Sequence, residues 1–201
     1  MSKNLSLAEK LAKLEYLQEW IDFCFLSIEL LDAQILDMQI TGDNNTEHYR
    51  YASFRKWLYS QKNITTQQID NYIFLAQNDS DKLMGGAALV DLLKSEKLSD
   101  AEFIYLVNKI DNGQEWIAKH IFKSALLRNL NQSKLSDSEF DTLISKGDSS
   151  IHLLLLEHSD VSKERMSVLA EYGASKKVRN IALAKVNSLT FWTKQKKADD
   201  I

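Results

Sequence analysis

Apolar residues recur along most of this chain at steps of three and four, the spacing that places them on one face of an α-helix. The first such run extends from Leu7 to Met38 without a proline or a glycine, and it fits either one long helix or two helices with an unmarked break. A turn cluster over 41–45 follows it. The pattern predicts an all-α protein in which residues 1–62 form an N-terminal helical cap.

A second amphipathic helix is predicted over 47–61, with Thr46 as its N-cap, and it mixes aromatic with basic residues. Such a mixture suits a surface that stacks bases and binds phosphates. Its apolar positions nevertheless keep a helical spacing, so we favour a buried face. We expect Tyr51, Phe54, Trp57 and Leu58 to point inward, and Arg50, Arg55 and Lys56 to be solvated.

Two nearly identical segments mark helix starts: 98–103 reads Leu-Ser-Asp-Ala-Glu-Phe and 135–140 reads Leu-Ser-Asp-Ser-Glu-Phe. In each, the Ser and the Glu three residues later have the spacing of a capping box. There the hydroxyl accepts from the backbone N–H of the Glu, and the carboxylate accepts from that of the Ser. Related starts occur at Ser6, Thr65 and Ser162, although the last has an Arg where the Glu should be. A helix start used this often is a repeat signature.

Four helical hairpins follow from these starts, in units that begin near 64, 98, 135 and 161. The predicted helix pairs are 66–76 with 81–95, 100–110 with 114–130, 137–145 with 149–158, and 163–172 with 175–194. Gly173 stands at a C-cap position. Gly85 and Gly86 fall inside a helix, where we expect them to allow another helix to approach closely.

This pattern resembles the HEAT and armadillo class of helical repeats over about 64–188, a class-level likeness. It rests on the paired helices and on the stretch 178–184, Val-Arg-Asn-Ile-Ala-Leu-Ala, with 117–121 and 84–89 in equivalent places. The class's proline and its ladder of Asp and Arg are not evident here. The resemblance implies a right-handed stack of hairpins, an α-solenoid, over 63–195 with one continuous core and an extended concave surface. Residues 196–201 would form a tail.

Composition and charge further limit the classes of protein to which this chain can belong. The chain has no proline, six glycines and a net charge of -3, with nine basic against four acidic residues over 161–201. Cys24 is the single cysteine, which excludes an internal disulfide, and its apolar neighbours predict that it is buried. The N-terminus does not read as a signal peptide, and apolar runs fall short of the roughly 18 residues of a membrane span. We therefore expect a cytoplasmic protein.

Candidate chemistry is sparse. His152 and His158 are six residues apart, whereas metal ligands on one helix are usually three or four apart, so we expect the histidines at the surface or half-buried and predict no metal site. The glycine pair is not followed by the Lys-Ser/Thr of a phosphate loop. We predict no cofactor. Whether the chain is an enzyme stays open, and the sequence leans against it.

The least ordinary surface chemistry lies on the second helices of the hairpins, which line the concave side in HEAT-like stacks. We expect the partner-binding residues to be Trp116, His120, Lys123, Arg128, Lys176 and Arg179. The sequence favours a protein-binding module of the adaptor or immunity-inhibitor type, whose partner is another protein. The alternative is a nucleic-acid binder in the style of the HEAT-like alkylpurine DNA glycosylases. A mixed or acidic concave surface would favour protein, and a basic one nucleic acid.

Overall fold

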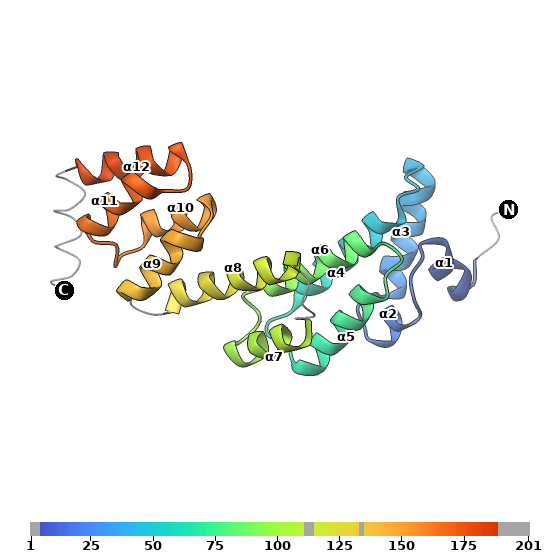
Figure 1. Ribbon diagram of the computed structural model, residues 1–201. Helices are drawn as coiled ribbons and strands as arrows, with labels where there is room; N and C mark the ends of the chain where they lie inside the picture. The colour runs from blue at the N-terminus through green and yellow to red at the C-terminus, as the bar shows by residue number, and fades with distance from the viewer. Residues whose placement is uncertain (1–4, 111–114, 133–134, 189–201) are drawn as a thin grey trace. The chain divides into compact units, whose positions relative to one another are not determined.

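The structure is a computed structural model that describes residues 5–110, 115–132 and 135–188 (Figure 1). Within these residues the chain forms twelve α-helices and no strand, which confirms the all-α class. The chain divides into two compact units, residues 1–121 and 122–201, each described here by itself. The helices of the first unit are α1 (Leu7–Lys13), α2 (Glu19–Asp22), α3 (Ile28–Thr41), α4 (Thr46–Ser60), α5 (Thr66–Gln77), α6 (Lys82–Leu93) and α7 (Asp100–Ile110), followed by α8 (Glu115–Gln132).

The apolar run over 7–38 forms three helices, so the expectation of one helix or two is wrong. Helices α1 and α2 are each followed, two residues after their last residue, by a residue in the left-handed conformation, Glu15 with φ of 58° and Cys24 with φ of 60°. The N–H of Tyr16 then donates to the oxygen of Leu11 at 2.9 Å, and the equivalent bond closes α2. These are Schellman turns without the usual glycine, so the sequence carries no mark of them.

Cys24 is exposed rather than buried. The sequence-based prediction placed it on the apolar face of a continuing helix. Because the helix has already ended at Asp22, Cys24 occupies the turn instead, and only its neighbours Phe25 and Leu26 enter the core.

An aromatic cluster forms the core of the first unit. The ring centroids of Trp20 and Phe54 are 4.4 Å apart, and Phe25 stacks on Trp57 at 4.0 Å. Tyr72 of α5 packs against the same rings. The predicted inward face of α4 is therefore confirmed at Phe54, Trp57 and Leu58, all of which are buried.

The expectation that Arg50 is solvated is wrong. Its side chain is 1% exposed, as is that of Asp79 in the α5–α6 turn. The guanidinium makes two parallel bonds to this carboxylate, Nε to Oδ2 at 2.8 Å and Nη2 to Oδ1 at 3.0 Å, and Nη1 donates to the oxygen of Leu14 at 3.0 Å. Burial of a charge in this way requires a partner, and the partner lies 29 residues away along the chain.

The helix starts are largely as predicted. Capping boxes close at Ser6 and Thr65, and at Ser99 and Ser136 the hydroxyl and the following Glu exchange the expected bonds. Ser162 caps α11 without a box. Helix α4 differs, because Asn45 rather than Thr46 occupies its N-cap position and makes no side-chain cap bond.

The glycine pair in α6 confirms the predicted close approach. A Cβ atom added to Gly85 would lie 2.1 Å from the backbone oxygen of Ala76 in α5, so only glycine fits there. The bond from the Tyr72 hydroxyl to the oxygen of Ala88, at 3.0 Å, ties the same two helices together. The face of α6 that meets α5 is therefore the one that carries Gly85 and Ala88.

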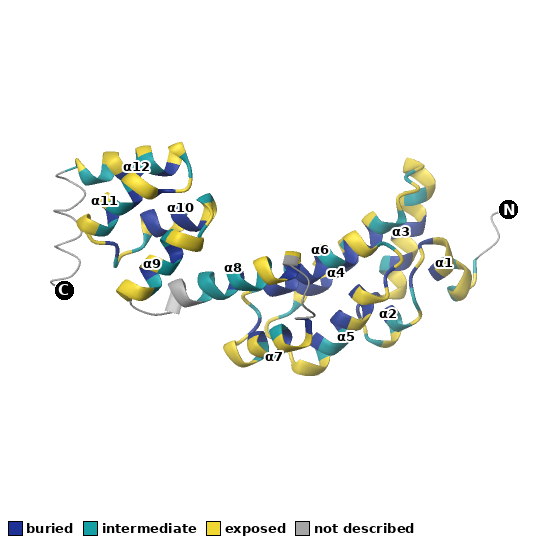
Figure 2. Cartoon of the chain, viewed as in Figure 1, coloured by how far each residue is buried: buried dark blue, intermediate teal, exposed yellow. Residues whose placement is uncertain are grey.

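The second unit contains α9 (Asp137–Lys146), α10 (Ser149–Glu157), α11 (Lys163–Tyr172) and α12 (Lys176–Val186). Their buried faces form one apolar cluster around Leu143, Leu155, Leu169 and Val178 (Figure 2). Helix α12 ends at Val186, short of the expected 194. The predicted tail lies outside the described residues.

His152 is buried, which corrects the expectation of a surface or half-buried histidine. The backbone N–H of Ala174 donates to its Nδ1 at 2.8 Å, so Nε2 carries the proton and donates to the oxygen of Leu143 at 3.0 Å. A neutral imidazole with one donor and one acceptor matches both partners. His152 thus joins α9 and α10 to the turn before α12 as a structural residue.

Candidate functional site

A groove of about 610 Å³ lies in the first unit between α4, α6 and the first turns of α8. Its lining is mostly apolar, with charged side chains at the margins. The lining residues are Tyr51, Lys82, Leu83, Gly86, Ala87, Val90, Asp91, Lys94, Trp116 and His120. Six of the ten come from α6, and Lys94 is its C-cap residue. The face of α6 away from Gly85 forms the floor.

The floor has a regular helical register. Leu83, Ala87, Val90 and Lys94 follow one another at steps of four, three and four, so they share one stripe of α6. Leu83 is 87% exposed. The middle of the stripe carries Ala87, which is exposed, and Val90, which is 9% exposed, and both are smaller than Leu83 and Lys94 at its ends.

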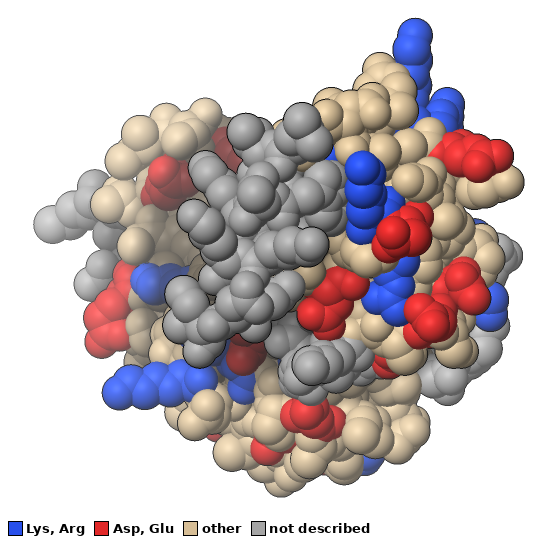
Figure 3. Space-filling model, turned by 90° about the vertical axis from the view of Figure 1, so that its left-hand side faces the viewer, with Lys and Arg blue, Asp and Glu red and all other residues tan. Residues whose placement is uncertain are grey.

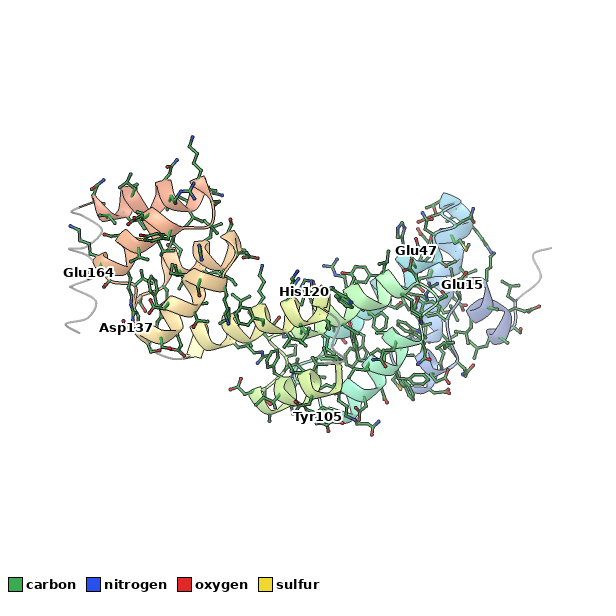
Figure 4. The ribbon with its side chains drawn as sticks, viewed as in Figure 1. Glu15, Glu47, Tyr105, His120, Asp137 and Glu164 are labelled. Atoms are coloured by element: carbon green, nitrogen blue, oxygen red, sulfur yellow. The ribbon has the colours of Figure 1, made fainter. Side chains whose placement is uncertain are left out.

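Trp116 forms one wall. Its ring lies over Gly86, where an added Cβ would come 3.1 Å from Cη2 of the ring. The residue as a whole is nevertheless 43% exposed. His120 is one turn further along α8 (Figure 4), with its ring 6.3 Å from that of Trp116 and edge-on to it. One face of Trp116 thus packs on α6, and the remainder lines the groove.

Tyr51 of α4 also lines the groove and is only partly buried, which modifies its predicted inward position. Its hydroxyl donates to Asp91 Oδ2 at 2.7 Å. Burial raises the pKa of Tyr51, and the Asp91 carboxylate adds to this effect. The guanidinium of Arg55 lies 5.9 Å from the Tyr51 ring, within the range of a cation–π contact.

The charge around the groove is mixed. Lys82 and Lys94 mark the two ends of its floor, and Lys82 Nζ donates to the oxygen of Gln77 at 2.7 Å. Residues 1–121 as a whole hold twelve Lys and Arg against eighteen Asp and Glu. Figure 3 is viewed from the side on which Figure 1 draws α11 and α12, which do not line the groove, and on that face basic and acidic side chains of the described residues are also interspersed. The groove is therefore not lined by the continuous basic surface that nucleic-acid binding requires.

The structure brings together two of the six residues predicted to bind a partner, Trp116 and His120. The other four belong to residues 122–201 and do not line the groove. Lys123 pairs with Asp148 at 3.0 Å, and Arg179 Nη1 donates to the oxygen of Gly173 at 2.7 Å. Arg128 is partly buried, and Lys176 is exposed in the first turn of α12.

Sequence reasoning missed the floor itself. Leu83, Ala87 and Val90 read as part of a helix that is apolar on every side, and such a helix is usually buried all round. The sequence did contain one signal for the groove. Two adjacent glycines in a helix indicate that other parts of the chain pack closely on two neighbouring faces of α6. The α5 backbone takes one face at Gly85, and Trp116 takes the next at Gly86.

Comparison with protein-family models, with curated proteins and with solved structures gave no match. Among the described residues, His, Cys, Asp and Glu do not gather in threes that could hold a metal ion. None of the described helices combines the length and the apolar character that crossing a membrane needs.

Proposed function

We propose that this protein is a protein-binding module built of helical hairpins, and that its partner docks in the groove between α4, α6 and α8. The observation that supports the proposal is the group of exposed apolar side chains that line the groove, Leu83 at 87% and Trp116 at 43% exposed, together with the exposed Ala87. Large apolar side chains grouped at a surface and rimmed by charges are typical of interaction sites. Trp is moreover enriched among residues that dominate binding energy.

The pairs α5–α6, α7–α8, α9–α10 and α11–α12 would be the repeat units of a right-handed, HEAT-like stack, with 1–62 as its cap. In that arrangement the second helix of each pair carries the binding surface, and α6 and α8 are second helices. The adaptor or immunity-inhibitor class fits such a module, because its activity is to hold another protein.

A groove-filling substitution tests the proposal. Ala87 is exposed on the floor, so Ala87→Trp should fill the groove while the fold is kept; Ala101→Trp adds the same side chain at an exposed position of α7 outside the groove. Proteins captured from the native host would be compared between wild type and both variants, with and without nuclease. The captured partner would then be purified and its affinity measured by calorimetry.

We expect a nuclease-resistant partner that binds wild type and Ala101→Trp but binds Ala87→Trp at least tenfold more weakly. Equal affinity for all three proteins would refute the groove as the site. Capture that disappears with nuclease, or a salt-sensitive complex with DNA lost on changing Lys176, Lys177 and Arg179 to Ala, would support the nucleic-acid alternative instead.

Truncation of Trp116 separates its contribution to partner binding from its contribution to stability. Because the residue is partly exposed, we expect Trp116→Ala to weaken partner binding by more than about 1 kcal/mol, as for an interface anchor. Its cost in stability should fall below the roughly 3–5 kcal/mol of a fully buried Trp. Thermal melts beside the binding assay measure both quantities, and a full core-sized loss of stability with unchanged affinity would contradict the assignment.

A further inference from the structure

Helix α3 presents an exposed apolar stripe that nothing in the described residues covers. Leu36 is 56% exposed and Ile40 is 76% exposed, and both lie on the same side of the helix as the exposed residues Glu29 and Ala33. The C-terminal end of α3 is exposed almost all round (Figure 2). An uncovered stripe of this kind is expected where another surface docks.

All the charged residues of α3 are acidic. Its fourteen residues include Glu29, Asp32 and Asp37 and no Lys, Arg or His. Asp32 pairs with Lys10 at 2.5 Å, and Asp37 accepts from the Tyr49 hydroxyl at 2.9 Å. Glu29 lies at the N-terminal end of the exposed stripe, so it is the carboxylate that a docked surface would meet first.

The groove offers the opposite charge. Lys82 and Lys94 flank its floor at the two ends of α6, about 18 Å apart along the helix axis. Asp91, the one carboxylate among its lining residues, is engaged by the Tyr51 hydroxyl. Asp81 beside the floor caps α6 by accepting from the backbone N–H of Leu83. An occupant therefore meets mainly cations at the ends of an apolar floor.

The two stripes have the same register. On α3 the positions are 29, 33, 36 and 40, and on α6 they are 83, 87, 90 and 94, so both advance by four, three and four. Laid antiparallel, Glu29 faces Lys94, Ala33 faces Val90, Leu36 faces Ala87 and Ile40 faces Leu83. Each large side chain at the centre meets a small one, and unlike charges meet at one end. Laid parallel, Ile40 would face Lys94 and Ala33 would face Ala87, which leaves a charge against an apolar residue and a gap.

We propose that the groove binds helix α3 of a second copy of this chain, antiparallel to α6. This inference rests on the proposed function, because it uses the same groove. The occupant that it names is helix α3 of a second copy of the chain. Because donor and acceptor surfaces differ, the contact is head-to-tail and leaves an unused groove at one end and an unused α3 at the other. Three turns of helix bury a small area, so the association is weak, and a tighter partner of the groove would displace it.

Complementing variants test this pairing. Leu36→Gln with Ile40→Gln removes the apolar stripe at two exposed positions, and Ala87→Trp fills the groove; circular dichroism checks that both fold. Sedimentation velocity from about 5 to 500 µM, the range in which an interface of this size would act, measures the assembly. Wild type should grow with concentration beyond a dimer, and each variant alone should stay monomeric.

A mixture of the two variants carries one intact groove and one intact α3, so it should form a 1:1 dimer and nothing larger. A wild type that stays monomeric throughout would overturn the inference, as would an Ala87→Trp protein that still assembles or a mixture that stays monomeric. Partner capture distinguishes this failure from failure of the proposed function. The Leu36→Gln, Ile40→Gln protein keeps its groove and should still bind a captured partner.

Discussion

Neutralising Asp79 tests the buried ion pair that holds α4 to the α5–α6 turn. Asp79→Asn keeps the shape of the side chain and its acceptor for the N–H of Asp81, which now bonds at 2.8 Å. It removes the negative charge, and it places an amide NH₂ against one N–H of Arg50. The guanidinium, 1% exposed, is then a buried charge without its main counter-charge.

Breaking a buried pair by removing one partner costs about 3–5 kcal/mol. Two features place this site at the lower end of that range. Glu15 Oε2 lies 3.3 Å from Arg50 Nη1, and the Leu14 oxygen and the Thr46 hydroxyl go on accepting from the same nitrogen. We therefore expect Asp79→Asn to lower the free energy of unfolding by about 3 kcal/mol.

The assay is urea denaturation followed by far-UV circular dichroism and by the fluorescence of the buried residues Trp20 and Trp57. Glu15→Gln is the control, because that carboxylate is 53% exposed and should contribute no more than about 1 kcal/mol. The double variant should lose more than the two losses added together, since Glu15 is the remaining counter-charge. A loss below about 1 kcal/mol for Asp79→Asn, or simple additivity, would refute the reasoning.

Three further predictions concern helix ends, close packing and pH. Ser136→Ala should lower stability by roughly 0.5–2 kcal/mol by removing an N-cap acceptor, and Ser138→Ala, one residue inside the helix, should cost less; equal shifts in thermal melts would contradict the cap. Gly85→Ala should destabilise through its clash with the α5 backbone, whereas Gly86→Ala should change stability little, because about 1 kcal/mol of helix propensity offsets a small shift of the Trp ring. Urea midpoints will rank the two. Burial raises the pKa of Asp148, but hydrogen bonds from neighbouring donors outweigh it and lower the pKa overall. Its contribution to stability is therefore present above about pH 4 and is lost as pH falls through the lowered value, so Asp148→Asn should flatten the acid limb of a stability-versus-pH curve.

The sequence by itself determined where most helices begin. A capping box needs only a Ser or Thr and a Glu or Gln three residues apart, so Thr65, Ser99 and Ser136 could be assigned without knowledge of the fold. The apolar spacing of α4 likewise identified Phe54 and Trp57 as buried, because a helix of period 3.6 fixes which side chains share a face.

Tertiary structure alone decided the features that depend on distant partners. Arg50 reads as a solvated residue until Asp79, 29 positions later, is brought against it, and His152 is buried because Ala174, 22 positions later, supplies its donor. The breaks at Glu15 and Cys24 use left-handed residues that are not glycine, so local propensity does not reveal them. The groove depends on the packing of Trp116 over Gly86. A sequence can place these residues on helix faces, but whether a face is covered is set by how helices far apart in the chain pack together.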